Sequence, residues 1–133
     1  MILLDTHAVI WFTAEDEALG KQSLRLARQA LAEDRLYVSA ISFWEIGLLI
    51  AKGRLQAIDE PGEQRLRILS SGIREAPLTG DIALQAVGLK NLQGDPADRF
   101  IVATTIAHDA VLMTADKRLL TWRHTVKRQD ASK

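Results

Sequence analysis

The sequence predicts an α/β protein with a three-layer α/β/α sandwich around a small central parallel sheet. Short apolar runs at 2–4, 36–38 and 111–114 have the length of buried strands. Longer segments with apolar residues at helical spacing separate these runs. Strands that alternate with helices form parallel sheets covered on both faces, which gives the predicted layers.

The composition is typical of a soluble globular protein. With 133 residues, of which 47% are hydrophobic and 26% charged, the chain can bury a core as one domain over residues 1–133. It contains no cysteine, which excludes disulfides, thiolate catalysis and cysteine-bound zinc or iron–sulfur sites. The apolar runs are too short for a signal peptide or a membrane span, so a cytoplasmic protein without a membrane partner is expected.

The charge balance argues against a protein that grips nucleic acid with its whole surface. Seventeen basic and seventeen acidic residues give a formal net charge of zero, so such binding would need a local patch or a metal ion. Basic residues do gather near the end of the sequence, at Lys117, Arg118, Arg123, Lys127, Arg128 and Lys133. A solvated, fraying terminus explains this cluster equally well.

Each predicted element follows from local spacing and from its start and stop residues. Pro77 restricts the third strand to an edge of the sheet, because proline cannot donate a ladder hydrogen bond. Gly53 and Gly72 end the helices that precede them. In order, the expected elements are a strand at 2–4, a helix through 8–12, a helix at 21–33, a strand at 36–38, a helix at 41–51, a helix at 63–71 begun by Pro61, a strand at 73–78, a helix at 81–89, a helix at 96–108, a strand at 111–114, a helical turn at 117–120 and a last short strand at 125–126.

The stretch 94–105 places two carboxylates at the start of a largely apolar helix. Asp95 is predicted as the N-cap, Pro96 as the first helical residue, and Asp98 falls one turn further on. A helix N-terminus favours ionised carboxylates, which are good ligands for hard divalent cations. Because this helix leads into the fourth strand, its start is expected at the amino ends of the strands unless the preceding connection brings it over. The residues alone leave open whether Asp98 meets the other acids.

Asp5 and Asp116 follow the first and the fourth predicted strands. If those strands are neighbours, both carboxylates face the crevice at the carboxyl edge of the sheet, where ligands bind. Glu45 is the only charge between Arg35 and Lys52, and a carboxylate in so apolar a setting needs a partner. A capping box formed by Ser42 and Glu45 would satisfy it equally well.

Other site types have little support in the sequence. Each of Asp5, Asp95 and Asp116 precedes a helix and could serve only as a cap. The three histidines lack metal-ligand spacing. Trp11 and Trp44 are expected in the core, whereas Trp122, among the basic residues, fits either a core position or a platform on which a base stacks. There is no Ser-His-Asp order and no glycine-rich phosphate loop.

Four motifs taken together resemble the PIN-domain family, and in particular its VapC-type toxins of bacterial toxin–antitoxin systems. They are Leu4-Asp5-Thr6-His7, Ser39-Ala40-Ile41-Ser42-Phe43-Trp44-Glu45-Ile46, Asp95-Pro96-Ala97-Asp98-Arg99-Phe100-Ile101-Val102-Ala103 and Leu112-Met113-Thr114-Ala115-Asp116. The resemblance covers almost the whole chain. It implies a PIN-like α/β/α fold and a metal-dependent endoribonuclease toxin, neutralised by a cognate antitoxin whose C-terminal segment occupies the active-site groove.

The resemblance also assigns roles to individual residues. It implies that Asp5, Glu45, Asp98 and Asp116 are the catalytic acids. Asp5, Asp98 and Asp116 would bind Mg²⁺ or Mn²⁺, Asp116 either directly or through water, and Glu45 through water or at a second ion. Such clustered carboxylates repel one another, so raised pKa values are expected in the metal-free site.

The remaining expectations concern neighbouring residues and partners. Ala115 stands where the family often has arginine, which affects expected phosphate contacts, and Asp95 is expected to cap its helix and to pair with Arg99. The resemblance further implies an RNA substrate and a homodimer. Two alternatives stay open: a metal-dependent nuclease that acts on DNA, and a non-catalytic binding module whose acids only cap helices.

Overall fold

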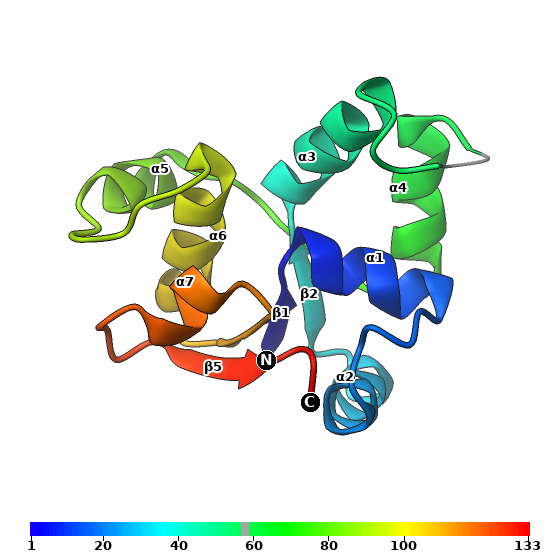
Figure 1. Cartoon of the computed structure of the whole chain (residues 1–133), viewed down its shortest axis with the longest axis horizontal. Coiled ribbons are helices and arrows are strands. Elements are labelled where there is room, and N and C mark those ends of the chain that lie inside the picture. The colour runs from blue at the N-terminus through cyan, green and yellow to red at the C-terminus, as the bar shows by residue number, and fades with distance from the viewer. Residues whose placement is uncertain (57–58) are drawn as a thin grey trace.

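A computed structural model describes residues 1–56 and 59–133, and within them the chain forms five strands and seven helices. Figure 1 shows helices on both sides of one central sheet. The elements are β1 (Ile2–Leu4), α1 (Thr6–Ala14), α2 (Lys21–Ala32), β2 (Leu36–Ser39), α3 (Ala40–Ala51), α4 (Pro61–Ser70), β3 (Arg74–Ala76), α5 (Gly80–Val87), α6 (Pro96–Ala107), β4 (Val111–Thr114), α7 (Lys117–Thr121) and β5 (Lys127–Asp130).

The sheet is parallel throughout and has the order β3-β2-β1-β4-β5. The chain first builds β1, β2 and β3 toward one edge, then returns to add β4 on the other side of β1. β1 is therefore the central strand, and the strand order reverses beside it. The predicted edge position of the third strand is confirmed, because β3 pairs only with β2 among the described strands.

Alternation along the strands divides the core into two layers. Leu4 of β1 and Met113 of β4 point to the side covered by α1, α2 and α4, where the side chains form one buried cluster. Leu3 and Leu112, one residue earlier, point to the other side and pack with Ile101 of α6 and with α7. α5 packs on α6 (Figure 1), and α3 is in contact with both α1 and α6. The predicted α/β/α layering is confirmed.

Two expectations about individual elements were wrong. The last strand is Lys127–Asp130, not 125–126. The four residues of β5 are all polar, so no apolar pattern marks them as a strand. The side chain of Arg128 connects this strand to the preceding segment by donating to the main-chain carbonyls of Leu119, Trp122 and His124. Trp44 was expected in the core but is 52% exposed on α3. In the part of the chain that the structure describes, no helix has the length and apolar character needed to cross a bilayer.

Candidate functional site

The candidate site lies at the carboxyl edge of the sheet, where β1 and β4 end side by side. The two strands pair in register, with Leu4 opposite Met113. Asp5 follows β1 directly, and Asp116 lies two residues beyond β4. The condition that the first and fourth strands be neighbours is therefore met. This edge, beside the reversal of strand order, is where open parallel sheets bind ligands.

Asp5 is held rigidly by groups on both sides of its carboxylate. It is the N-cap of α1, and one oxygen accepts a hydrogen bond from Ala8 N at 2.8 Å. The other oxygen accepts from the hydroxyl of Thr114. The Thr114 oxygen in turn accepts from the main-chain N–H of Asp116 at 3.1 Å. One threonine thus ties the two strand-end aspartates together.

Glu45 lies on α3 and does not belong to a capping box. The N-cap of α3 is Ser39, whose hydroxyl oxygen accepts from Ile41 N at 3.3 Å, so Ser42 and Glu45 both lie inside the helix. Glu45 instead accepts a hydrogen bond from the hydroxyl of Thr6 at the start of α1. Thr6 Oγ1 also lies 3.0 Å from Ser42 Oγ. The partner that the half-buried Glu45 carboxylate requires is therefore a threonine from a neighbouring helix.

α6 brings Asp95 and Asp98 to the same edge. The expectation that this helix starts at the amino ends of the strands was wrong, because a helix that leads into a parallel strand runs antiparallel to it and so begins at the carboxyl edge. Asp95 caps α6 as predicted, accepting from Ala97 N at 3.0 Å. The expected Asp95–Arg99 pair does not form. Arg99 donates to four main-chain carbonyls, those of Ala86, Val87, Leu89 and Leu92.

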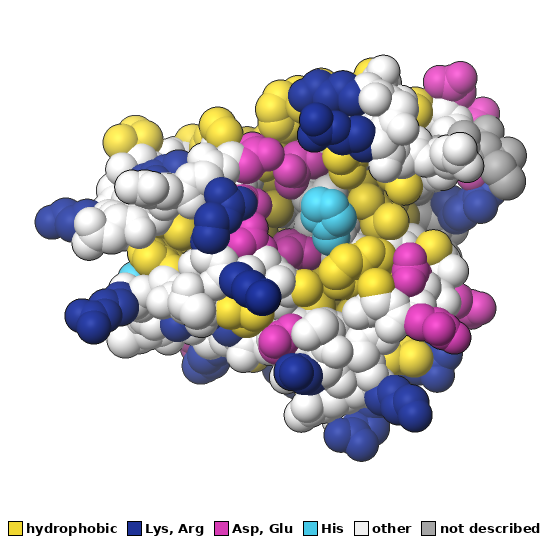
Figure 2. Space-filling view, viewed as in Figure 1, with side chains coloured by type: hydrophobic (Ala, Val, Ile, Leu, Met, Phe, Trp, Pro, Cys, Tyr) yellow, Lys and Arg dark blue, Asp and Glu magenta, His cyan; other side chains and the backbone are white. Residues whose placement is uncertain are grey.

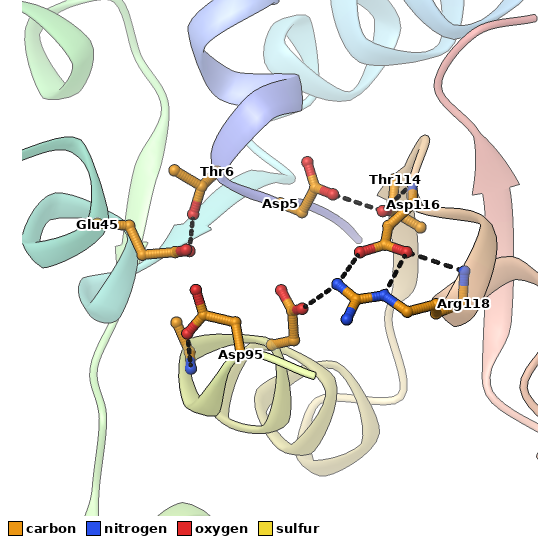
Figure 3. Close-up of polar contacts among 9 residues, drawn as sticks. Asp5, Thr6, Glu45, Asp95, Thr114, Asp116 and Arg118 are labelled. Atoms are coloured by element: carbon orange, nitrogen blue, oxygen red, sulfur yellow. Dashed lines mark hydrogen bonds and ion pairs between the residues drawn. The ribbon is translucent and has the colours of Figure 1, made fainter. Parts of the chain in front are cut away.

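Asp116 caps the short helix α7 and binds Arg118. Its carboxylate accepts from Arg118 N at 2.8 Å and from the guanidinium at 2.9 and 3.3 Å. The same guanidinium reaches Asp98, with a nitrogen–oxygen distance of 3.6 Å. Arg118 therefore bridges two acids that come from different elements, as the contacts of the labelled residues in Figure 3 illustrate for Asp116.

These side chains surround one cavity of about 360 Å³. Figure 2 shows the acidic side chains gathered in a hollow near the centre of one face, beside a histidine. Arg118 is the one arginine or lysine among the described residues that line the cavity. Its lining comprises Asp5, Thr6, His7, Trp11, Glu45, Asp95, Asp98, Ala115, Asp116 and Arg118.

Burial and mutual repulsion raise the pKa of three of the acids. Burial is the main cause for Asp5 and Glu45, and hydrogen bonds from Thr114 and Thr6 partly offset it. For Asp98, burial and then the charges of Glu45, Asp116 and Asp95 raise the pKa to about 7. Asp116 differs from the expectation, because the hydrogen bond from Arg118 lowers its pKa.

The donor set fits a hard divalent cation. Five carboxylates line the cavity, and a cation there would offset the burial and the mutual repulsion that raise the pKa of three of them. As the side chains stand, however, no group of three or more histidine or acidic residues within 1–56 and 59–133 is arranged to hold an ion. Thr6, Thr114 and Arg118 occupy carboxylate oxygens instead.

Reasoning from sequence missed the residues that support the acids. Thr6 and Thr114 each lie within two positions of a strand-end aspartate, and that adjacency is the one signal that could have identified them. Arg118 was counted only as part of a basic tail. His7, interpreted as structural, and Trp11, interpreted as a core residue, both line the cavity, with ring centroids 6.1 Å apart.

Comparison with known proteins gives consistent matches over nearly the whole chain. A family model described as the PIN domain matches residues 2–123. The chain is 37% identical over 124 residues to a protein named Ribonuclease VapC22 from Mycobacterium tuberculosis (strain ATCC 25618 / H37Rv), and the match covers 92% of each chain.

Two solved structures have a similar fold. One is VapBC2 from Rickettsia felis bound to a DNA fragment from their promoter, with a TM-score of 0.71, 16% identity and coverage of 97% of this chain and 98% of that chain. The other is FitAcB from Neisseria gonorrhoeae, with a TM-score of 0.61, 26% identity and coverage of 87% and 88%.

Proposed function

Because this chain belongs to the PIN-domain family, we propose that it is a divalent-metal-dependent endoribonuclease that acts as a toxin and is neutralised by a cognate antitoxin. The observation that carries the proposal is the gathering of five carboxylates around one cavity at the switch point of the sheet. The ribonuclease name of the relative at 37% identity supports the reaction class. Residues 1–133 would act as one nuclease domain.

In this proposal Asp5, Asp98 and Asp116 hold Mg²⁺ or Mn²⁺. When bound, the ion supplies positive charge that lowers the pKa of water and stabilises charge on the phosphate. Thr114 orients the Asp5 carboxylate, and its oxygen accepts the main-chain N–H of Asp116, so one residue fixes the main chain at Asp116 relative to Asp5. Oxygen ligands without sulfur favour these two metals over softer ions.

Glu45 has a different role from the other acids. Thr6 orients it, and its raised pKa makes it a better proton acceptor than an ordinary glutamate. We assign it contact with water in the cavity, where it can accept a proton from the nucleophile.

The alternative in which the acids serve only as caps is correct in part. Asp5, Asp95 and Asp116 do accept main-chain N–H bonds at helix starts. A carboxylate has two oxygens, however, and capping occupies one. Glu45 and Asp98 cap no helix, and both have raised pKa values. A pure capping function leaves the position of these two acids without a reason.

Cleavage of matched RNA and DNA strands tests the proposal. The purified chain, freed from any antitoxin, is expected to cut end-labelled RNA with Mg²⁺ or Mn²⁺ and to stop in EDTA. Asp5→Asn should abolish cleavage while leaving the circular dichroism spectrum unchanged. Asp81→Asn is the matched control, because Asp81 is an exposed acid in the first turn of α5 and should behave as the unmodified chain. Equal cleavage by the Asp5→Asn protein would contradict the assignment, and a preference for DNA would change the substrate.

The antitoxin is tested in cells. Expression of the chain alone is expected to arrest growth, and co-expression of the small protein encoded beside it should restore growth and co-purify with the chain. Mapping RNA ends during arrest identifies the target, which the sequence does not specify. Growth arrest of equal strength by the Asp5→Asn variant would show that toxicity does not come from the nuclease.

A further inference from the structure

Arg118 contacts two acids of the cavity at once. Its guanidinium makes two contacts with the Asp116 carboxylate, at 2.9 and 3.3 Å, and reaches Asp98 at 3.6 Å. Asp98 and Asp116 come from α6 and from the end of β4, so no local sequence constraint forces one arginine onto both. The contact exists because the fold brings two carboxylates together and the arginine neutralises them.

The backbone at Gly94 allows this position. A Cβ built on Gly94 would lie 2.6 Å from a guanidinium nitrogen of Arg118, so any side chain there would displace the arginine. Gly94 also has φ +132°, a conformation that other residues rarely adopt. The loop before α6 thus passes close to the guanidinium on one side. On the other side the arginine is open, with 58% of its side chain exposed.

Arginine and a divalent ion cannot both use the same carboxylate oxygens. One Asp116 oxygen already accepts the main-chain N–H of Arg118 and a guanidinium N–H, and the other accepts a second guanidinium N–H. An ion bound by Asp116 must therefore replace at least one guanidinium contact. A positive charge so close would also repel the ion.

We propose that Arg118 is a built-in counter-cation of the acid cavity, which pairs with Asp116 and reaches Asp98 in the metal-free chain and which a divalent ion must displace. The inference rests on the metal site of the proposed function and deepens it. It accounts for the observation that the acids lining the cavity are not arranged around an ion position, because the guanidinium contacts both Asp98 and Asp116. Displaced toward solvent, the guanidinium stays at the rim of the cavity, where it can contact a phosphate.

Metal titration of arginine variants tests the inference without any RNA. The protein is stripped with EDTA, dialysed and titrated with Mn²⁺ by calorimetry. Arg118→Gln removes both the competitor and the repulsion, so its dissociation constant for Mn²⁺ should fall about two- to fivefold, the range for a partly exposed ion pair. Arg118→Lys keeps the charge but loses the bidentate contact, so its dissociation constant for Mn²⁺ should lie between those of the unmodified chain and of Arg118→Gln. Arg123→Gln is the matched control, an exposed arginine outside the cavity lining, and should not change the constant.

Thermal unfolding gives a second readout. Without metal, Arg118→Gln leaves the acids without their counter-charge, so its melting temperature should fall, and Mn²⁺ should raise it by more than it raises that of the unmodified chain. If Arg118→Gln fails to fold, Arg118→Lys carries the test alone, with tighter Mn²⁺ binding expected.

The outcomes separate this inference from the proposed function. If the unmodified chain binds Mn²⁺ and the Arg118→Gln protein binds it with equal or weaker affinity, the counter-cation role is overturned and the proposed metal site stands. Weaker binding would mean that Arg118 supports the site instead of competing for it. No Mn²⁺ binding by any of these proteins would overturn the metal site and this inference together.

Discussion

Asp98→Asn is expected to make the metal-free protein more stable at alkaline pH while removing its activity. Asp98 lies among Glu45, Asp116 and Asp95, and its pKa is raised from 3.8 to about 7. The folded chain therefore holds this residue in its charged form at a cost when the pH is high. Asparagine has a similar shape and no charge, so the substitution removes the cost together with a proposed metal ligand.

The magnitude follows from the pKa. A change from 3.8 to about 7 corresponds to about 4 kcal/mol of folding free energy if it counted in full. The carboxylate is partly accessible to solvent, with 17% of its side chain exposed, and it contacts Arg118, so we expect about 2 kcal/mol after screening. That is a large fraction of the stability of a typical domain.

The sign depends on which state binds the proton. Between the unfolded pKa near 3.8 and the folded pKa near 7, the folded state holds a proton on Asp98 that the unfolded state has lost. The free energy of unfolding of the unmodified chain therefore falls as the pH rises through this window. The Asp98→Asn protein has no carboxyl group at this position, so its free energy of unfolding lacks this decrease with pH. Its advantage should be smaller at pH 5 than at pH 8, where it reaches its full size.

Urea unfolding in EDTA, followed by circular dichroism at pH 5 and pH 8, measures the difference. Asp81→Asn is the matched control, because Asp81 is in the first turn of α5 as Asp98 is in that of α6, but it is exposed. The control should lose a few tenths of a kcal/mol at both pH values, from its interaction with the helix dipole. The reasoning is refuted if Asp98→Asn is no more stable than the unmodified chain at pH 8, or if its advantage is equal at pH 5.

Two further predictions concern the surroundings of the site. Arg99→Met keeps the aliphatic stem but removes four hydrogen bonds to main-chain carbonyls, so urea unfolding should show a loss of about 2 kcal/mol or more, whereas a loss below about 0.5 kcal/mol would contradict this role. The homodimer remains a prediction, and Leu84 and Val87, 73% and 79% exposed on α5, are apolar side chains that contact between two copies would bury. Light scattering after gel filtration should show a dimer, and Leu84→Glu should shift it toward monomer. Leu66 is 61% exposed on α4, and Leu66→Glu should leave the dimer unchanged. Equal effects of the two variants would exclude α5 as a specific interface.

Sequence reasoning located the acids that follow strands, because strand ends in a parallel sheet share an edge. Asp5 and Asp116 needed only the pairing of β1 with β4 to become neighbours. Asp98 was harder, since its place depends on the direction of α6, and the expected direction was wrong. Glu45 had two equal interpretations, and only the observed N-cap at Ser39 removed the capping box.

The supporting residues could not be predicted because they act across long stretches of chain. Thr6 and Glu45 are 39 residues apart, and Thr114 and Asp5 are 109 apart. A threonine next to an aspartate has many uses, and spacing does not reveal which. Arg118 was counted with the other basic residues late in the sequence, and its residue type does not reveal which role each of them has. Arg118 binds acids of the cavity, whereas Arg128 donates to main-chain carbonyls.

The central position of β1 has a consequence for how the protein is made. β1 is synthesised before both of its neighbours, yet it is paired on one side only when β4, more than a hundred residues later in the sequence, is available. Asp5, Glu45 and Asp98 are all synthesised before Asp116, so the acid cavity stays incomplete until Asp116 has been made. Whatever chemistry the assembled cavity performs cannot begin before the chain has been made as far as Asp116.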